Sequence, residues 1–269
     1  MILLTMNIKE YVIKRKQELK ETVNGLTRKP CLIIIQVNND PASDAYVRGK
    51  LKDGAECGMN VKLDKQEPSI TEDALIKIIS QYNNDESVDG LIVQMPLPKH
   101  INEDHIKLAV NPIKDVDGFH PLSKLSPCTP KGIIDYLKSE GVVFSGKNAC
   151  VIGRSNIVGK PMQKLLLKEN ANVTQMMSKT TREDMEFYLG HADIIVVAVG
   201  KKYFLDHTFK LKESCVVVDV GINRDDTGLK GDCEPNLKVK LQTPVPGGVG
   251  LLTRLTLLTN LLEAYYARS

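Results

Sequence analysis

The sequence predicts an α/β protein that consists of two successive α/β units. In the first unit, two apolar segments at 31–37 and 89–98 lie on either side of a segment with helical periodicity at 45–58. The order strand, helix, strand, with strands that are apolar on both faces, is typical of a parallel sheet covered by helices. The pattern starts again after the segment 117–132, which contains prolines and glycines. We therefore expect a domain boundary in that segment.

The second unit is predicted from four short apolar segments, separated by stretches that can form helices or turns. The segments are NACVIG at 148–153, ANVTQMM at 171–177, ADIIVVAVG at 192–200 and SCVVVDVG at 214–221. The leucine-rich segment at 250–268 has a helical pattern and is predicted to pack against a core. Its periodicity alone does not tell on which of the two units it packs.

Composition and charge argue against several classes of protein. The 269 residues include 36 Lys and Arg against 33 Asp and Glu, and charges of both signs are interspersed. Without a long basic run, the chain lacks the charge pattern of a nucleic-acid-binding protein. Aromatic residues make up 5% and tryptophan is absent, so stacking platforms for single-stranded nucleic acid are not expected either. A small-molecule binder or an enzyme is the default expectation.

Cellular location and metal binding are predicted from the absence of particular patterns. No uncharged apolar run reaches about 18 residues, the minimum for a membrane span, and the N-terminal segment shows no cleavage site of a signal peptide. The six cysteines are widely spread without a C-x-x-C pair, which favours reduced, buried thiols. The five histidines show no spacing typical of zinc sites. We therefore expect a cytoplasmic protein without a bound metal.

A glycine turn in the second unit is a candidate phosphate-binding element. Gly153 directly follows the apolar segment ACVI, and a helix is predicted to start near Lys160. Backbone N–H groups in such a turn can approach a phosphate, and the helix dipole favours negative charge there. The spacing differs from G-x-G-x-x-G, so an ordinary tight turn remains an alternative. Gly200 and Gly221 also end apolar segments, and ligands of open α/β sheets bind at that edge.

The end of the next predicted strand favours NADP over NAD as the nucleotide. An NAD-selective fold usually carries a carboxylate there to bind the adenosine ribose. Here Met177 is followed by no acidic residue until Glu183. Arg154 lies in the first turn, where its guanidinium could bind the 2′-phosphate of NADP. The alternative is that Arg154 and Lys179 are solvated surface cations.

Five polar positions in the first unit are candidates for chemistry. Tyr46 and Lys50 are four residues apart and share one face of the predicted helix. Gln94 interrupts an apolar run, and a buried amide needs partners either in a core or in a binding cleft. Asp115 and Asp117 flank a turn in KDVDGF, where structural aspartates are common. For each position a purely structural role remains the alternative.

Taken together, eight strings resemble the bifunctional methylenetetrahydrofolate dehydrogenase/cyclohydrolase family. In order, they are PASDAYVRGK, DGLIVQMPLP, KDVDGFHP, PCTPKG, GRSNIVGKPM, ADIIVVAVG, VVVDVGIN and TPVPGGVG. They extend from about residue 41 to residue 250, most of the chain.

The resemblance implies a fold of two α/β domains on either side of a cleft, the second being a Rossmann-like NADP-binding domain. The first domain would comprise 1–125, completed by the C-terminal helix at 250–269, which returns to it, and the second would comprise 126–249. A homodimer formed largely through the nucleotide domain is implied as well.

The resemblance also implies two activities. The family oxidises 5,10-methylenetetrahydrofolate to 5,10-methenyltetrahydrofolate with NADP and hydrolyses the product to 10-formyltetrahydrofolate, in the one-carbon metabolism that serves purine biosynthesis. By motif, Lys50 looks like the catalytic lysine, Tyr46 the ring that stacks on the folate, Gln94 the amide that positions Lys50, and Asp117 the group that binds the pterin.

Further residues follow from the same resemblance. A wall of the folate site would be formed by Pro246, Gly247 and Gly248. The contacts to NADP would be Gly153, Arg154, Ser155, Ser178 and Ile222. Hydride transfer needs chiefly positioning by such residues, because the cofactor carries the electron chemistry.

Departures from the family pattern keep two other functions open. The expected D-G-K element is replaced at 4–6, a common histidine is Met177 here, and the usual P-M after PGGVG is Leu251 followed by Leu252. Having Leu251 in place of a proline is expected to relax the start of the final helix. One alternative is therefore a member with only one of the two activities. The other, from a different class, is a non-catalytic nucleotide-sensing protein.

Overall fold

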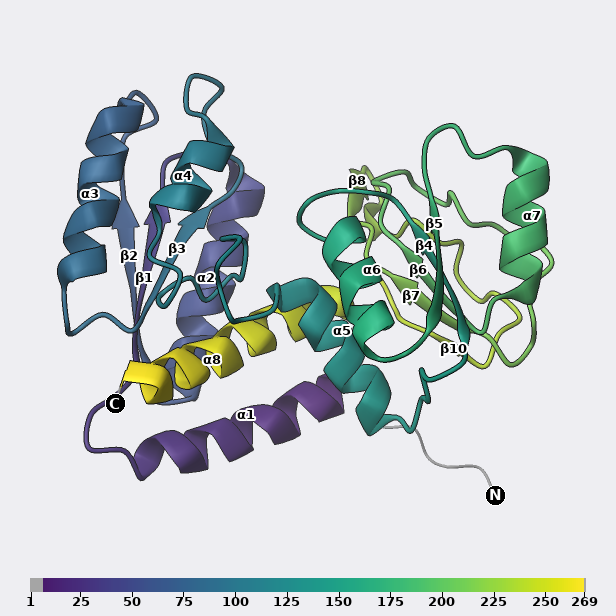
Figure 1. Cartoon of the computed structure of the whole chain (residues 1–269), viewed down its shortest axis with the longest axis horizontal. Helices are drawn as coiled ribbons and strands as arrows, with labels where there is room; N and C mark the ends of the chain where they lie inside the picture. Colours follow the sequence, from purple (N-terminus) through teal and green to yellow (C-terminus); the bar gives the residue numbers. More distant parts are fainter. Residues whose placement is uncertain (1–6, 269) are drawn as a thin grey trace. The chain divides into compact units, whose positions relative to one another are not determined.

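The computed structural model describes residues 7–268. These residues form two compact units, which are coloured along the sequence in Figure 1. The first unit consists of residues 13–128 and 254–268, and the second unit consists of residues 7–12 and 129–253. The departure from the family pattern at 4–6 lies outside the described residues. The domain boundaries expected from the resemblance stay a prediction.

The first unit contains a three-stranded parallel sheet in the order β2, β1, β3. Its strands are β1 (Cys31–Gln36), β2 (Asn60–Lys65) and β3 (Gly90–Gln94), and its helices are α2 (Pro41–Glu56), α3 (Glu72–Asn84) and α4 (Glu103–Ala109), together with the larger part of α1 (Ile8–Asn24). Apolar side chains of α3 and α4 pack on one face of β1 and β3. On the other face, α2 contacts β2, and Leu261 of α8 (Val249–Arg268) closely approaches Gly90 of β3.

The two strands and the helix predicted for this unit are confirmed, with shifted ends. The helix begins at Pro41 because the Asp40 carboxylate caps it, accepting the N–H of Ser43 at 2.8 Å, and because proline suits the first helical position. Strand β2 is absent from the sequence prediction. It lies at the sheet edge and alternates only weakly between half-buried and exposed residues, so it gives no apolar run.

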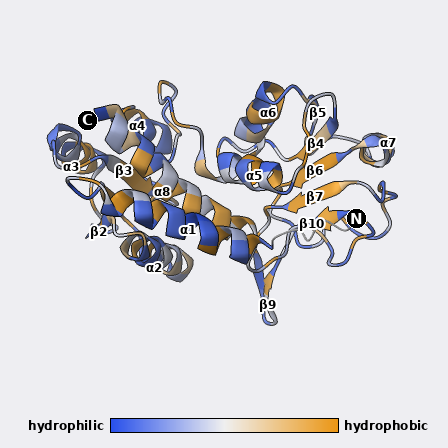
Figure 2. Cartoon of the chain, turned by 90° about the horizontal axis from the view of Figure 1, so that it is seen from below, coloured by the Kyte–Doolittle hydropathy of each residue, from blue (hydrophilic) through white to orange (hydrophobic). Residues whose placement is uncertain are grey.

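The second unit contains a five-stranded parallel sheet in the order β10, β7, β6, β4, β5. Its elements are α5 (Cys128–Ser139), β4 (Asn148–Ile152), α6 (Gly159–Lys168), β5 (Asn172–Met176), α7 (Arg182–His191), β6 (Ile194–Val197), β7 (Val216–Asp219), the antiparallel hairpin of β8 (Asn223–Asp225) and β9 (Gly228–Lys230), and β10 (Leu241–Gln242). The hydrophobic colour of β6 and β7 in Figure 2 matches their complete burial. The four strands predicted for this unit are confirmed as β4 to β7.

The C-terminal part of α8 returns to the first unit, as the resemblance implies. Asn260 fixes it there, because its buried amide nitrogen donates to the carbonyl oxygens of Val116 at 2.9 Å and Ser126 at 3.0 Å. Near the C-terminus, the guanidinium of Arg28 lies 4.6 Å from the ring centroid of Tyr265. The helix starts regularly at Val249, with the N–H of Leu251 donating to Gly248.

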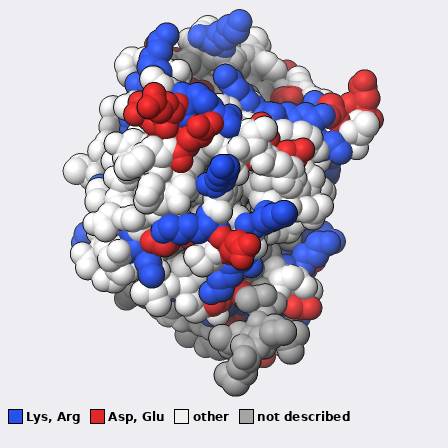
Figure 3. All heavy atoms as spheres, turned by 90° about the vertical axis from the view of Figure 1, so that its right-hand side faces the viewer, with Lys and Arg blue, Asp and Glu red and all other residues white. Residues whose placement is uncertain are grey.

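The surface and the cysteines complete the description of the fold. Figure 3 shows one face on which Lys and Arg are interspersed with Asp and Glu. Between residues 7 and 268, none of the helices combines the length and apolar character that crossing a membrane requires. Over the same residues, no group of three or more His, Cys, Asp or Glu gathers as a metal site would need. All six cysteines are buried, and none forms a disulfide.

Candidate functional site

A lysine, an amide and an aromatic ring meet at the carboxyl end of the sheet in the first unit. Lys50 of α2 is only 5% exposed, and its Nζ donates to Oε1 of Gln94 at 2.9 Å. The same Nζ lies 5.1 Å from the ring centroid of Tyr46, one turn earlier on α2. The structure therefore brings together three of the residues predicted from the sequence. A buried amine held by one oriented acceptor is a fixed donor or acceptor for a ligand at the strand ends.

The position of Gln94 is set by its neighbours. Its Nε2 donates to the carbonyl oxygen of Met95 at 2.8 Å, which directs Oε1 toward Lys50. In the sheet register, Gln94 pairs with Gln36 at the end of β1. Gln36 is 1% exposed and donates to the Asp44 carboxylate at 2.7 Å, so it ties α2 to the same sheet edge. This hydrogen bond, with help from Lys65, lowers the pKa of Asp44.

Gln36 is a residue that the sequence analysis missed. It interrupts the apolar run CLIIIQV in the same way as Gln94 interrupts LIVQM. The signal that indicated Gln94 was therefore present for Gln36 as well.

Asp117 lies on the loop after α4, and this loop runs alongside the edge of β3. Asp115 forms an isolated bridge with Leu91, and the N–H of Leu91 donates to the carbonyl oxygen of Lys114 at 2.8 Å. Asp117 is half-buried and lines a small cavity together with Asp115 and Phe119. Asp117 thus belongs to the same unit as Lys50 and Gln94, on a loop fixed to the strand that carries Gln94.

Asp115 holds the shape of this loop. It is buried, and its two carboxylate oxygens accept the N–H of Gly118 at 3.1 Å and of His120 at 2.7 Å. Burial, opposed by the His120 N–H and assisted by the negative charge of Asp117, raises the pKa of Asp115 from 3.8 to about 6. Lys107 of α4 also lines the cavity beside it.

The raised pKa of Asp115 predicts a pH-dependent stability. Between about pH 4 and pH 6, the folded protein holds a proton on Asp115 that the unfolded chain releases. The stability from this proton is present below about pH 4 and is lost as the pH rises through about 6, a change of about 3 kcal/mol. We expect the unfolding free energy of wild type, relative to Asp115→Asn, to fall by this amount between pH 4 and pH 7.5 in urea titrations. A difference that stays constant with pH would contradict the assignment.

The residues predicted to contact NADP lie at the carboxyl edge of the second sheet. Gly153 to Ser155 follow β4, Ser178 follows β5, and Ile222 follows β7 by three residues. The side chains of Arg154, Ser155, Ser178 and Ile222 are exposed. The structure thus gathers all five predicted positions on one edge, as the strand pattern requires.

The turn after β4 leaves its backbone open to a ligand. Gly153 has φ +115°, and a Cβ built there would overlap the carbonyl oxygen of Ala198, so only glycine fits. The Ser155 hydroxyl accepts the N–H groups of Val158 at 3.1 Å and Gly159 at 3.3 Å, which starts α6. Arg154 stands exposed beside this helix start. Such an arrangement can hold a phosphate group.

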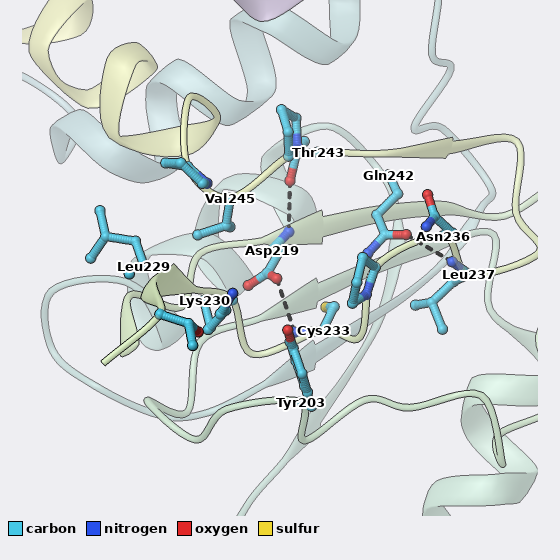
Figure 4. A pocket seen from close by; sticks show the side chains of 16 residues that line it. Tyr203, Asp219, Leu229, Lys230, Cys233, Asn236, Leu237, Gln242, Thr243 and Val245 are labelled. Carbon is cyan, nitrogen blue, oxygen red and sulfur yellow. Dashed lines mark hydrogen bonds between the residues drawn. The ribbon is translucent and has the colours of Figure 1, made fainter. Parts of the chain in front are cut away.

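The three residues predicted to form a wall of the folate site belong to the second unit. Pro246, Gly247 and Gly248 immediately precede α8, and Gly247 has φ +90°. Pro246 lines a cavity of about 720 Å³, whose other walls come from β7, β10 and the β8–β9 hairpin. Figure 4 shows this cavity, with Asp219 at its centre and Val245 at one side.

Models of two domains of a single family match the chain. The catalytic domain of tetrahydrofolate dehydrogenase/cyclohydrolase matches residues 6–117, and the NAD(P)-binding domain matches residues 127–269. The chain belongs to the tetrahydrofolate dehydrogenase/cyclohydrolase family. The resemblance inferred from the eight strings is therefore confirmed.

Individual members of the family are similar over nearly the full chain. The bifunctional protein FolD of Bacillus subtilis is 45% identical, with 95% of this chain and 93% of that relative aligned. Among solved structures, the bifunctional enzyme FolD of Campylobacter jejuni has a TM-score of 0.93 at 39% identity, covering 98% of both chains. The Trypanosoma brucei FolD, solved with NADP and an inhibitor, has a TM-score of 0.89 at 29% identity, covering 98% of this chain and 97% of that one.

Proposed function

We propose that this chain is a bifunctional enzyme of folate one-carbon metabolism. It oxidises 5,10-methylenetetrahydrofolate to 5,10-methenyltetrahydrofolate with NADP, and it hydrolyses the product to 10-formyltetrahydrofolate. The observation that carries the proposal is the hydrogen bond of 2.9 Å between Lys50 and Gln94 at the end of β3, within the stretch that matches the family's catalytic domain.

In the proposed hydrolysis, Lys50 moves the proton. Water forms a C–O bond with the methenyl carbon and loses a proton to the Lys50 amine in its unprotonated form. The bond between that carbon and N5 then breaks as the hydroxyl group loses its proton to form the formyl C=O, N5 takes up one proton in exchange, and the formyl group remains on N10. Gln94 keeps Nζ in one orientation through its Oε1, which supports proton transfer at a defined place.

The other candidate residues bind and orient the folate. Tyr46 presents a ring next to Lys50, and a ring there can stack on the planar part of the substrate. Asp117 can accept N–H groups of the pterin, a two-point contact that fixes the ring's direction. Asp115 keeps the Asp117 loop in shape through its two backbone hydrogen bonds.

The cofactor edge fits a dinucleotide phosphate. NADP, when bound, accepts the hydride that the methylene carbon loses. Gly153 and the start of α6 would hold the pyrophosphate with backbone N–H groups, because no Cβ separates that turn from a ligand. Arg154 and Ser178 would bind the 2′-phosphate, since no acidic side chain follows β5 before Glu183.

The preference for NADP can be tested at Arg154. We expect Arg154→Ala to raise the KM for NADP about tenfold, the effect of one lost charge-assisted contact, while the KM for NAD changes little. Steady-state dehydrogenase kinetics with each cofactor measure both constants. Equal changes for NADP and NAD would show that Arg154 does not select the 2′-phosphate.

A homodimer formed through the second unit is part of the proposal. Strand β5 forms one edge of the five-stranded sheet and is only partly buried. Apolar side chains are exposed on neighbouring segments, with Leu167 on α6 and Met177 directly after β5. An open strand edge with apolar flanks favours association with a second copy. Sedimentation equilibrium measures the mass, and a monomer at micromolar concentration would refute this part.

A cytoplasmic location is also part of the proposal. Six free and buried thiols are expected of a protein kept in a reducing compartment. Fractionation of the source cells tests the location, and recovery of the protein outside the cytoplasm would overturn it.

Two assays separate the proposed function from its alternatives. One measures NADPH formation from methylenetetrahydrofolate, and the other measures the loss of methenyltetrahydrofolate absorbance. The bifunctional enzyme gives both signals. A monofunctional member gives one of them; this alternative is suggested by Leu251 and Leu252, which depart from the family pattern. A nucleotide-sensing protein binds NADP and gives neither.

A further inference from the structure

A buried carboxylate holds the loop that follows β6 in the second unit. Asp232 has no exposed surface, and its Oδ2 accepts the N–H groups of Val199 at 2.7 Å and Gly200 at 2.9 Å. Its Oδ1 accepts the N–H of Lys201 at 2.8 Å and the side-chain amide of Asn223 at 2.9 Å. Three consecutive backbone N–H groups that point at one carboxylate form an anion-binding nest. Here the chain's own carboxylate fills that nest.

A second buried carboxylate holds Asp232 in turn. Asp219, the last residue of β7, accepts the N–H groups of Asp232 at 2.9 Å and Cys233 at 2.9 Å. It also accepts the N–H of Gly221 at 3.0 Å, and its own N–H donates to the Thr243 hydroxyl at 2.8 Å. Figure 4 shows Asp219 between Thr243 and Cys233, with both hydrogen bonds drawn. The backbone around Asp232 is therefore fixed to the end of β7.

Close contacts connect this pair of carboxylates with the cofactor edge. A Cβ at Gly221 would overlap the carboxyl group of Asp232, and Ile222, a predicted NADP contact, follows directly. At the other end, Gly153 packs on the carbonyl oxygen of Ala198, next to the loop that Asp232 holds. A continuous row thus joins the turn after β4, the loop after β6, Asp232 and the turn after β7.

We propose that Asp232 is a positioning residue for the dinucleotide, which fixes the turn carrying Gly153 relative to the turn carrying Ile222 and itself makes no contact with the cofactor. Because the Asp232 carboxylate already occupies the backbone N–H groups of the nest after β6, the pyrophosphate binds at the turn after β4. Asp219 supports this role by fixing Asp232. The inference rests on the proposed NADP-linked activity.

The carboxylate cannot be replaced by an amide without losing partners. Asn offers one acceptor oxygen, and its NH₂ group would face two of the four donors that Asp232 now satisfies. In Asp232→Asn the loop 199–201 would therefore shift, and the two turns would no longer match the length of the cofactor. We expect the KM and the dissociation constant for NADP to rise at least tenfold. Hydrolysis of methenyltetrahydrofolate should stay within twofold, because Lys50 and Gln94 belong to the other unit.

The experiment compares Asp232→Asn with a control at the opposite end of β6. Asp193 lies directly before β6, where its carboxylate likewise accepts a backbone N–H, that of Asn148, at 3.0 Å. Asp193→Asn should leave the KM for NADP unchanged. Both variants and wild type are assayed for NADP-dependent oxidation, for cyclohydrolase activity and for NADP binding by calorimetry. If Asp232→Asn does not fold, Asn223→Ala, which removes only one donor to Asp232, should raise the KM for NADP about threefold.

The possible outcomes separate the inference from the proposed function. A selective rise in the KM for NADP in Asp232→Asn, or in Asn223→Ala, supports the positioning role. A folded variant with unchanged NADP binding overturns it, and so does an equal loss of both activities, which would indicate a merely structural role. If wild type itself shows no dehydrogenase activity, the proposed function fails, whatever the variants do.

Discussion

Lys50→Met is expected to lower the kcat for hydrolysis of methenyltetrahydrofolate by about a hundred- to ten-thousandfold, the usual contribution of a positioned acid or base. Methionine has nearly the length of lysine and no charge, so it can occupy the buried site beside Tyr46 without leaving a cavity. What is lost is the amine that Gln94 orients at 2.9 Å. The hydride transfer should fall less, because it depends chiefly on the position of cofactor and substrate.

A second lysine on the same helix provides the control. Lys52 is two residues further along α2, its side chain is 77% exposed, and its partner is Glu56 at 3.8 Å. Lys52→Met removes the same charge from the same helix and should leave both activities unchanged. The loss of methenyltetrahydrofolate absorbance is followed for wild type and both variants. Full turnover by Lys50→Met would remove Lys50 from the proposed mechanism.

Gly153→Ala is expected to abolish most NADP-dependent oxidation while cyclohydrolase activity persists. The added Cβ would overlap the Ala198 carbonyl oxygen, and a φ of +115° is strained for alanine, so the turn after β4 must move. A turn displaced by about 1 Å no longer presents its N–H groups to the pyrophosphate, and losses of about a hundredfold in kcat/KM follow from such displacements.

Gly146 separates the steric effect at Gly153 from backbone strain. Gly146 lies before β4 and has φ +71°, but a Cβ built there has no neighbour within 4 Å. Gly146→Ala should therefore cost about 1 kcal/mol of stability and leave the kcat/KM for NADP unchanged. Thermal unfolding and dehydrogenase kinetics measure the two effects. A Gly153→Ala variant that keeps wild-type NADP kinetics would contradict the role of this turn.

Much of the fold could be predicted because the buried parallel strands are continuous apolar runs. Strands β1, β3, β4, β6 and β7 have this character, and glycine or proline marks most of their ends. Strand β5, with the sequence NVTQM, lies at a sheet edge and is only partly buried, and it was predicted from the longer segment ANVTQMM. Strand β2 lies exposed at a sheet edge, and β10 contains two half-buried residues, so neither carries such a run. The β8–β9 hairpin is short and polar, which gives a turn signal but no strand signal.

Parts of the candidate site could be predicted from local patterns. Gln94 interrupts an apolar run, and Lys50 lies four residues from Tyr46 on one face of the predicted helix. The family resemblance then supplied the expected partnership of Lys50 and Gln94. Asp219 interrupts the apolar run VVVDV in the same way as Gln94, but the sequence alone does not indicate its partners, and Asp232 in GDC looks like part of an ordinary turn. The two aspartates are thirteen residues apart in sequence, and their role depends on the contact between the two turns that carry them.

The measurement that tests the central claim most directly is a product balance with the purified chain. Methylenetetrahydrofolate and NADP are supplied, and NADPH, methenyltetrahydrofolate and 10-formyltetrahydrofolate are quantified over time, with Lys50→Met as the parallel reaction. We predict that wild type forms 10-formyltetrahydrofolate in the same amount as NADPH, whereas Lys50→Met accumulates the methenyl compound. Accumulation of methenyltetrahydrofolate by wild type, or an absence of NADPH, would contradict the account of one chain that performs both reactions.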